Sequence, residues 1–259
     1  MDRRLFLKIA GAGVAGLGFP NMALPAWLPL PATPGKSLWS GSNGRTAGSC
    51  KVIGIGGAGC NILRAAWSTA TWDSADQRTE FICLDLGEQA LRYVAAVSKN
   101  HPKHTPVKTL SLAPVGAGGW VNGARAMALQ QRQALRALVA DADMVILVAG
   151  MGGGTGSGVT PILARLAHEA GALVVALVVT PYSYEGVRQR RANTALGYLR
   201  RETDRVMEFS NDEWAKRHTD DTPMIDVLNG LDRHIAGFIH GLIVTAKPYS
   251  SYEQRDGRT

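Results

Sequence analysis

Cysteine, aromatic residues and long hydrophobic runs are all scarce in this sequence. Its three cysteines, Cys50, Cys60 and Cys83, cannot all pair with one another and lack the spacing of zinc ligands, so we expect neither a disulfide framework nor a zinc site. Aromatic residues make up 7% of the chain and accompany no dense cluster of lysine or arginine, which argues against nucleic acid as a partner. What remains is a globular composition of 259 residues, enough for one large α/β domain or two small ones.

Residues 1–48 differ from the rest of the chain. They hold five basic residues against one acidic residue, which is +4 of the net charge of +7, and residues 2–8 (DRRLFLK) are similar to a twin-arginine export signal. Residues 9–19 are too few and too rich in glycine for a transmembrane helix, and a linker rich in proline and glycine follows. We predict a signal or anchor segment with its linker at 1–48 and a folded domain at 49–259. The alternative is that residues 1–48 are a basic tail without a role. Whether the protein is cytoplasmic, membrane-associated or exported therefore stays open.

A glycine-rich stretch at residues 150–158 (GMGGGTGSG) stands between two regular patterns. The apolar run 144–149 predicts a buried strand, and the apolar spacing over 159–170 predicts an amphipathic helix that ends at Gly171. Such a turn exposes backbone N–H groups beside the positive end of a helix, where phosphate binds readily. The sequence therefore predicts a phosphate-binding loop, to which Thr155 and Ser157 add hydroxyl groups.

Further apolar runs extend this arrangement along the chain. They predict strands at residues 52–55, 81–84, 107–112 and 173–179, and helical patterns alternate with them; Met127, Ala134, Leu135 and Leu138 mark one such helix. Continuous apolar strands that alternate with helices predict a doubly wound parallel α/β sheet with helices on both faces. Ligands of such sheets bind at the carboxyl ends of the strands, where the glycine loops of this sequence fall.

A second glycine turn, residues 56–61 (GGAGCN), leaves another function open. It follows the strand 52–55, and the strand 81–84 ends in Asp85, where a dinucleotide-binding fold would hold a ribose. An oxidoreductase that uses a nicotinamide or flavin cofactor is therefore one hypothesis. The richer loop at 150–158 weighs against it, because a single dinucleotide crevice does not need that loop.

The loop sequence GGGTGSG and its flanks resemble FtsZ of the tubulin/FtsZ superfamily. The flanks are ADMV at residues 142–145, GALVVA at 171–176 and TPYSYEG at 180–186, within a resemblance that runs from about residue 51 to about residue 248. It implies a domain that binds GTP or GDP, with Mg²⁺ as an expected companion held through water by Asp85. The phosphate-binding positions that it implies are Gly56, Gly57, Ala58, Gly59, Ala117, Gly118, Gly119, Gly152, Gly153, Gly154, Thr155, Gly156 and Ser157.

The same resemblance implies contacts to the ribose and the base. The ribose contacts carry over to Pro181, Glu185, Arg188, Gln189 and Arg190, with Gln189 where the family has an arginine. The guanine contacts carry over to Asn61, Asn211, Ile225 and Asn229. An asparagine amide can both donate and accept hydrogen bonds, which suits the reading of a base.

The chain departs from the family pattern at two of these places. Trp120 and Val121 follow the loop 115–119, where FtsZ has Asn-Pro, and Ile225 takes the place of an aromatic residue that stacks on the base. Ile225 belongs to the last long helix, which Thr222 and Pro223 are expected to open. The predicted buried stripe of this helix is Ile225, Leu228, Leu231, Ile235, Ile239 and Leu242.

Hydrolysis of GTP in FtsZ depends on an acidic loop that reaches the nucleotide of the next subunit. In this sequence residues 249–259 stand at that place, and the candidate catalytic residues Glu253 and Asp256 fall outside the register of the loop. A general base must lie within hydrogen-bond reach of the attacking water. The resemblance therefore implies head-to-tail assembly or scaffolding that depends on GTP, with weak or lost hydrolysis. Assembly at a membrane surface is one form of this hypothesis. A regulatory GTP-binding module that does not assemble is the open alternative.

Overall fold

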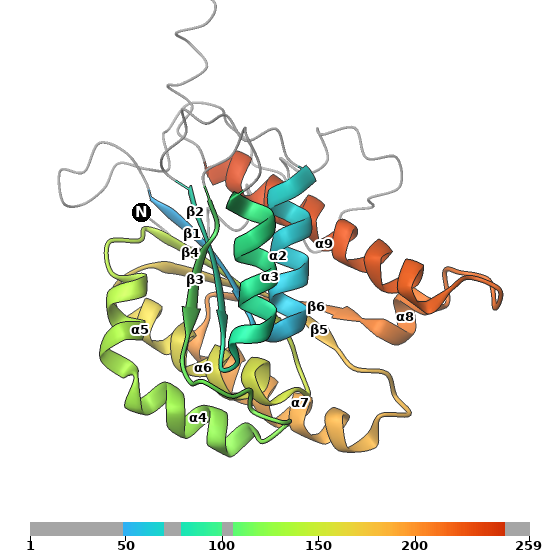
Figure 1. Ribbon diagram of the computed structural model, residues 1–259, viewed down its shortest axis with the longest axis horizontal. Helices are drawn as coiled ribbons and strands as arrows, with labels where there is room; N and C mark the ends of the chain where they lie inside the picture. The colour runs from blue at the N-terminus through green and yellow to red at the C-terminus, as the bar shows by residue number, and fades with distance from the viewer. Residues whose placement is uncertain (1–48, 70–78, 100–105, 247–259) are drawn as a thin grey trace, which may run out of the picture.

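A parallel sheet lies at the centre of the computed structural model, which describes residues 49–69, 79–99 and 106–246 (Figure 1). The strands are β1 (Cys50–Ile55), β2 (Thr79–Asp85), β3 (Lys108–Ser111), β4 (Met144–Gly150), β5 (Leu173–Thr180) and β6 (Arg205–Ser210). Their order across the six-stranded sheet is β3-β2-β1-β4-β5-β6, and all pairings are parallel. Dinucleotide-binding folds share this order, so the topology alone does not separate the two hypotheses.

Helices cover both faces of the sheet. They are α2 (Gly56–Thr69), α3 (Glu88–Lys99), α4 (Val121–Gln130), α5 (Arg132–Val139), α6 (Gly154–Glu169), α7 (Gly186–Glu202), α8 (Asn211–Ala215) and α9 (Met224–Ala246). One hydrophobic core lies between the sheet and α2, α3 and α9, and a second lies between the sheet and α4 to α7. The predicted doubly wound α/β fold is confirmed.

The central strand β4 shows why its sequence is continuously apolar. Met144, Ile146 and Val148 belong to the first core, whereas Val145 and Leu147 belong to the second. Successive side chains of a strand point to opposite faces, so a strand with helices on both sides has no face for polar residues.

Two helix predictions need correction. The single helix predicted through residues 127–138 is two helices, because the chain breaks at Gln131, and Ala134 is exposed rather than packed on the sheet. In α9 the stripe residues Leu231, Ile235, Ile239 and Leu242 are buried as predicted, but Ile225 and Leu228 are 62% and 36% exposed. The beginning of α9 extends away from α2 toward α8, so the buried stripe starts only at Val227 (Figure 1).

A helix that crosses a membrane must be both long and apolar. Within residues 49–69, 79–99 and 106–246 no helix is long and apolar enough to cross a bilayer. The predicted signal or anchor segment, residues 1–48, lies outside the described residues, so its role stays a prediction.

Asp232 on α9 makes the stability of this helix depend on pH. Burial raises the pKa of its carboxyl from 3.8 to about 6, although Arg64 and Arg233 act in the opposite direction. A carboxyl with a raised pKa binds its proton more tightly in the folded state, so the protein loses stability as pH rises from about 4 to about 6. We expect Asp232→Asn to raise the free energy of unfolding at pH 7 by about 1–2 kcal/mol, after allowance for its partial exposure.

Thermal unfolding between pH 4 and pH 7 measures this effect. The gain of the variant over the parent should shrink as the pH falls toward 4, where both side chains are neutral. Asp226→Asn, an exposed change on the same helix, serves as the control. A variant that is less stable than the parent at pH 7 would contradict the expectation.

Candidate functional site

A cleft of about 370 Å³ opens where the six strands end. Every strand or the loop after it contributes to the wall, as expected for a ligand site in a parallel sheet. The predicted residues in the wall are Gly56, Gly57, Ala58, Asp85, Ala117, Gly118, Gly119, Gly153, Gly154, Thr155, Gly156, Pro181, Glu185, Arg188 and Asn211. Residues from three glycine-rich segments of the chain thus meet in one cavity.

The amino-terminal end of α6 forms the floor of this cleft. Gly153 is its N-cap, with an extended backbone and no side-chain cap, and the helix begins inside the glycine run at Gly154. The first N–H groups of a helix have no partner within the helix, and they carry the positive end of its dipole. The cleft therefore offers backbone donors and positive potential to an anion.

Close backbone approach explains why the run contains glycine. A side chain at Gly156 would overlap the carbonyl oxygen of Gly150, and a Cβ at Gly154 would lie 2.6 Å from the Cβ of Ala117 and 3.1 Å from the backbone of Gly119. The loop 116–119 thus rests directly on the first turn of α6. Gly154 has no left-handed φ, so its need for glycine comes from this contact.

Polar side chains at the same end are held by hydrogen bonds. The hydroxyl of Thr155 donates to Oδ1 of Asp85 at 2.7 Å, and the same oxygen accepts from the backbone N–H of Leu86. Asp85 therefore fixes the rotamer of Thr155 in the wall of the cleft. One oxygen of Asp85 carries both bonds, which leaves the second oxygen for water or a cation.

The loop after β5 brings Glu185 to the opposite side. One carboxylate oxygen of Glu185 accepts from the backbone N–H of Tyr182 at 3.1 Å, and the other pairs with Arg188 at 2.7 Å. The hydroxyl of Tyr182 donates to the sulfur of Met224 at 3.2 Å, and burial raises the pKa of this hydroxyl. This contact ties the loop to the first turn of α9.

Asn211 stands at the end of β6, where α8 begins. Its Oδ1 is buried in the described structure and has no hydrogen-bond partner there. A buried acceptor without a partner costs free energy, so a ligand donor in the cleft would stabilise it. The side chain is an unpaired acceptor at the end of the cleft away from α3.

Some predicted phosphate residues lie outside the wall of the cleft. Ser157 accepts from the backbone N–H of Gly152 at 2.8 Å, so its hydroxyl shapes the turn, and it faces a different cavity. A side chain at Gly152 would collide with Arg188, and one at Gly59 would overlap the carbonyl of Val148. These glycines permit close packing behind the loops.

Some of the predicted ribose and base residues also lie outside the wall of the cleft. Gln189 donates to the carbonyl of Pro181 at 2.7 Å and so supports the loop from behind, while Arg190 lines the other cavity. Asn61, Ile225 and Asn229 are also absent from the wall of the cleft. The predicted catalytic residues Glu253 and Asp256 lie outside the described residues.

The wall also contains residues that were not among the individual predicted contacts, although some belong to the predicted glycine loops. They are Ile55, Gly116, Gly150, Met151 and Val179. Most of them end a strand or follow it directly, and their position after an apolar run was the available signal. A site at the carboxyl ends of strands includes the strand ends themselves.

The fold and the cleft define an α/β domain with a cavity suited to a phosphate-bearing ligand at the carboxyl end of its sheet. Residues 49–218 match the Tubulin/FtsZ family, GTPase domain. The chain belongs to this family. The predicted resemblance is confirmed, and the family assignment disfavours the oxidoreductase hypothesis.

Individual relatives agree with the family. The chain is 32% identical over 193 residues to the cell division protein FtsZ of Neisseria gonorrhoeae, and 35% identical over 163 residues to FtsZ 1 of Archaeoglobus fulgidus. These regions cover 74% and 62% of this chain but 46% and 42% of the relatives, so the chain spans about half of their length.

Solved structures show the same fold. An empty FtsZ dimer of M. jannaschii matches with a TM-score of 0.63 and 25% identity over 76% of this chain and 54% of that one. A protofilament of CetZ2 from Haloferax volcanii with bound GTPγS matches with a TM-score of 0.62 and 24% identity over 76% and 58%.

The two adjacent glycines at the start of α6 allow a matched test of the site. Gly154→Val places a branched side chain against Ala117 and Gly119, and overpacking of this kind costs about 1–3 kcal/mol. At Gly153 an added Cβ meets no protein atom within 4 Å, and the extended backbone accepts valine. We expect only Gly154→Val to lower the melting temperature of the ligand-free protein. Equal melting temperatures would show that the loop 116–119 does not rest on α6.

Proposed function

We propose that the cleft binds GTP or GDP and that the bound nucleotide promotes head-to-tail self-association, with slow hydrolysis. The observation that carries the proposal is the meeting of three glycine-rich segments at the amino-terminal end of α6, opposite the unpaired oxygen of Asn211. The family assignment supports the choice of nucleotide. Because the chain spans about half of its relatives, each of these activities is proposed for it on its own residues.

The phosphates would lie on the first turn of α6. Backbone N–H groups of Gly154, Thr155 and Gly156 are the donors there, and the loop 116–119 would close over the terminal phosphate. Asp85 fits a role in holding Mg²⁺, since this ion keeps several waters and takes few carboxylates beside phosphate oxygens. Within the described part of the chain no cluster of three or more acidic, histidine or cysteine side chains would hold a metal by itself.

The base would lie beside Asn211. Guanine carries N–H donors on its Watson–Crick edge, and the unpaired Oδ1 of Asn211 is an acceptor for them. Adenine presents an acceptor at the equivalent ring nitrogen and lacks the 2-amino group, so it offers no matching pair of donors to the Asn211 oxygen. The cleft should therefore favour guanine over adenine.

Removal of the Asn211 amide tests this assignment. We expect Asn211→Ala to weaken GTP binding about tenfold, since loss of a hydrogen bond to a buried group costs about 1–2 kcal/mol, and to leave ATP binding unchanged. Calorimetry with GTP, ATP and inorganic triphosphate measures the three affinities. Triphosphate, which has no base, is the control. An equal loss for all three ligands would place Asn211 at the phosphates or in the fold instead.

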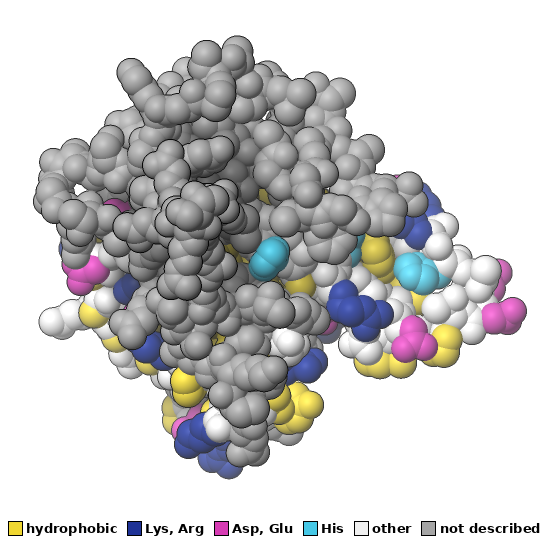
Figure 2. Space-filling view, turned by 90° about the horizontal axis from the view of Figure 1, so that it is seen from above, with side chains coloured by type: hydrophobic (Ala, Val, Ile, Leu, Met, Phe, Trp, Pro, Cys, Tyr) yellow, Lys and Arg dark blue, Asp and Glu magenta, His cyan; other side chains and the backbone are white. Residues whose placement is uncertain are grey.

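Exposed apolar side chains around the cleft support self-association. Tyr184 is 75% exposed next to Glu185, and Val115 and Trp120 flank the loop 116–119 with similar exposure. Figure 2 shows further hydrophobic side chains among charged ones at the end of the molecule formed by α8 and the start of α9, where Ile225 is exposed. An apolar rim around a ligand site is typical of a surface that a partner covers. The dimer and the GTPγS-bound protofilament among the relatives support a second copy as that partner.

Tyr184 provides the test of this rim. Its ring stacks on Tyr182 at 5.2 Å, so it is fixed in an exposed position. We expect Tyr184→Ser to raise the protein concentration needed for GTP-dependent light scattering at least about tenfold, since an aromatic anchor at an interface contributes about 2 kcal/mol. Leu129→Ser, a similar loss of exposed apolar surface on α4, should have little effect. Equal effects of the two changes would mean nonspecific association.

Slow hydrolysis follows from the state of the acidic residues in the cleft. Among the described residues of the wall the carboxylates are Asp85 and Glu185, and hydrogen bonds or an ion pair engage both. Both oxygens of Glu185 are engaged, and the second oxygen of Asp85 would be taken up by the Mg²⁺ proposed above, so neither would serve as a base for the attacking water. We therefore propose that hydrolysis is weak and depends little on association.

The dependence of GTP turnover on protein concentration distinguishes weak hydrolysis within one copy from hydrolysis that needs association. We expect a low specific activity that stays constant as protein concentration rises, with no further loss in Glu253→Ala or Asp256→Ala. If activity rises steeply with concentration and falls in either variant, residues 249–259 supply the base and the catalytic hypothesis replaces the scaffold one. A protein that binds GTP without any light scattering would be the regulatory module.

Contact with a membrane is proposed for residues 1–48 alone. The motivation is their basic, weakly apolar sequence and its similarity to a twin-arginine signal. Flotation of residues 1–259 and 49–259 with anionic vesicles tests it. Equal flotation of both would remove the role assigned to this segment.

A further inference from the structure

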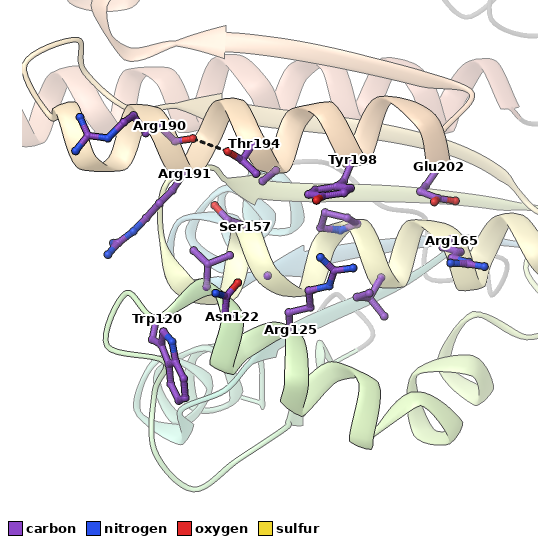
Figure 3. Close-up of a pocket in the computed structure, with 15 residues that line it drawn as sticks. Trp120, Asn122, Arg125, Ser157, Arg165, Arg190, Arg191, Thr194, Tyr198 and Glu202 are labelled. Atoms are coloured by element: carbon purple, nitrogen blue, oxygen red, sulfur yellow. Dashed lines mark hydrogen bonds between the residues drawn. The ribbon is translucent and has the colours of Figure 1, made fainter.

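A second cavity, of about 480 Å³, lies between α4, α6 and α7. It shares no lining residue with the cleft described above. Its volume falls in the range of small-molecule sites, about 300–1,000 Å³. Figure 3 shows α7 along one side and α4 along the other, with Arg125 extending from α4 toward Tyr198 on α7.

The floor of the cavity is apolar. Val121, Gly158, Pro161, Ile162 and Ala195 line it. A side chain at Gly158 would lie 2.6 Å from the carbonyl oxygen of Val121, so the glycine allows α4 to approach α6 at the base of the cavity. A ligand on this floor would bury an apolar body.

The walls carry positive charge that the described protein does not neutralise. Of the arginines in the wall, Arg165 pairs with Glu169, but Arg125, Arg190 and Arg191 form no ion pair in the described part of the chain. Glu202 is the carboxylate that lines the cavity among the described residues. Other arginines of α7, such as Arg200 with Glu208, do have partners. The unpaired charge thus collects around this cavity.

Aromatic rings hold the charged groups in place. The guanidinium group of Arg125, which lines the cavity, lies 5.2 Å from the centroid of the Tyr198 ring, and that of Arg201 lies 5.1 Å from it. At the other end Trp120 is 70% exposed and rests on Gly123, where any side chain would overlap its ring. A guanidinium held over an aromatic face loses little freedom when it binds an acidic group.

The positive groups form two ends. Arg191 extends toward Trp120, and Arg125 lies over the Tyr198 ring (Figure 3). Residues 191 and 198 are separated by seven positions of α7, which is about 10 Å along a helix. The apolar floor therefore lies between Arg191 at one end and Arg125 with Tyr198 at the other.

We propose that this cavity binds an elongated organic anion with an acidic group at each end and an apolar or aromatic body between them. Arg191 takes one acidic group and Arg125 takes the other, and the body lies on Pro161, Ile162 and Ala195 beside Tyr198. The site is separate from the nucleotide cleft, so the proposal does not depend on GTP binding.

A series of aromatic acids that differ in length and in number of carboxylates tests the proposal on the full chain. The probe is biphenyl dicarboxylate with its acids at the two far ends, compared with the shorter terephthalate and with biphenyl monocarboxylate. Equilibrium dialysis should show one saturable site for the long diacid and binding at least about tenfold weaker for the other two, because each loses a charge-assisted contact.

Two charge-neutralising variants locate the site. Arg125→Gln and Arg191→Gln should each weaken binding of the long diacid about tenfold. Arg200→Gln, on the same helix but paired with Glu208, should change it less than about twofold. Circular dichroism melting confirms that the variants fold. Absence of saturable binding, equal binding of all three acids, or equal loss in the Arg200 variant would each overturn the proposal.

Discussion

The first turn of α6 holds the site together because backbone lies on backbone there. Gly156 lies against the carbonyl of Gly150, and Gly154 lies under Ala117 and Gly119, at distances that no side chain permits. Strand β4 fixes one side of this contact, since both of its faces are buried in the cores. The loop after β3 is thereby set over the helix end, and the cleft forms between them.

This arrangement also places two cavities on either side of the same turn. Residues 153–156 line the nucleotide cleft, whereas Ser157 and Gly158 line the cavity between α4, α6 and α7. The loop 116–119 faces the cleft, and Trp120, the next residue, faces the other cavity. The two sites are distinct in their chemistry: the cleft presents backbone donors and few charges, while the cavity presents arginine and aromatic rings.

The sequence was sufficient for the sheet and the glycine loops, because continuous apolar strands and glycine runs leave a local pattern. It was insufficient where a role depends on packing at a distance. Ser157 accepts from the N–H of Gly152, and Gly59 packs against the carbonyl of Val148, and neither contact leaves a local pattern in the sequence. Ile225 fits the helical stripe of α9, yet it is exposed because the helix runs past its neighbours. The charged cavity left no pattern, since its arginines come from three helices.

The preference of the cleft for a guanine nucleotide can be measured with a panel of nucleotides. Residues 1–259 are stripped of bound nucleotide and titrated in a calorimeter with GTP, ATP and NAD. We expect one site that binds GTP at least about tenfold more tightly than ATP, because guanine would offer its adjacent N1–H and N2–H donors to the buried Asn211 oxygen, and no measurable binding of NAD. Equal affinity for GTP and ATP, or tighter binding of NAD, would contradict it.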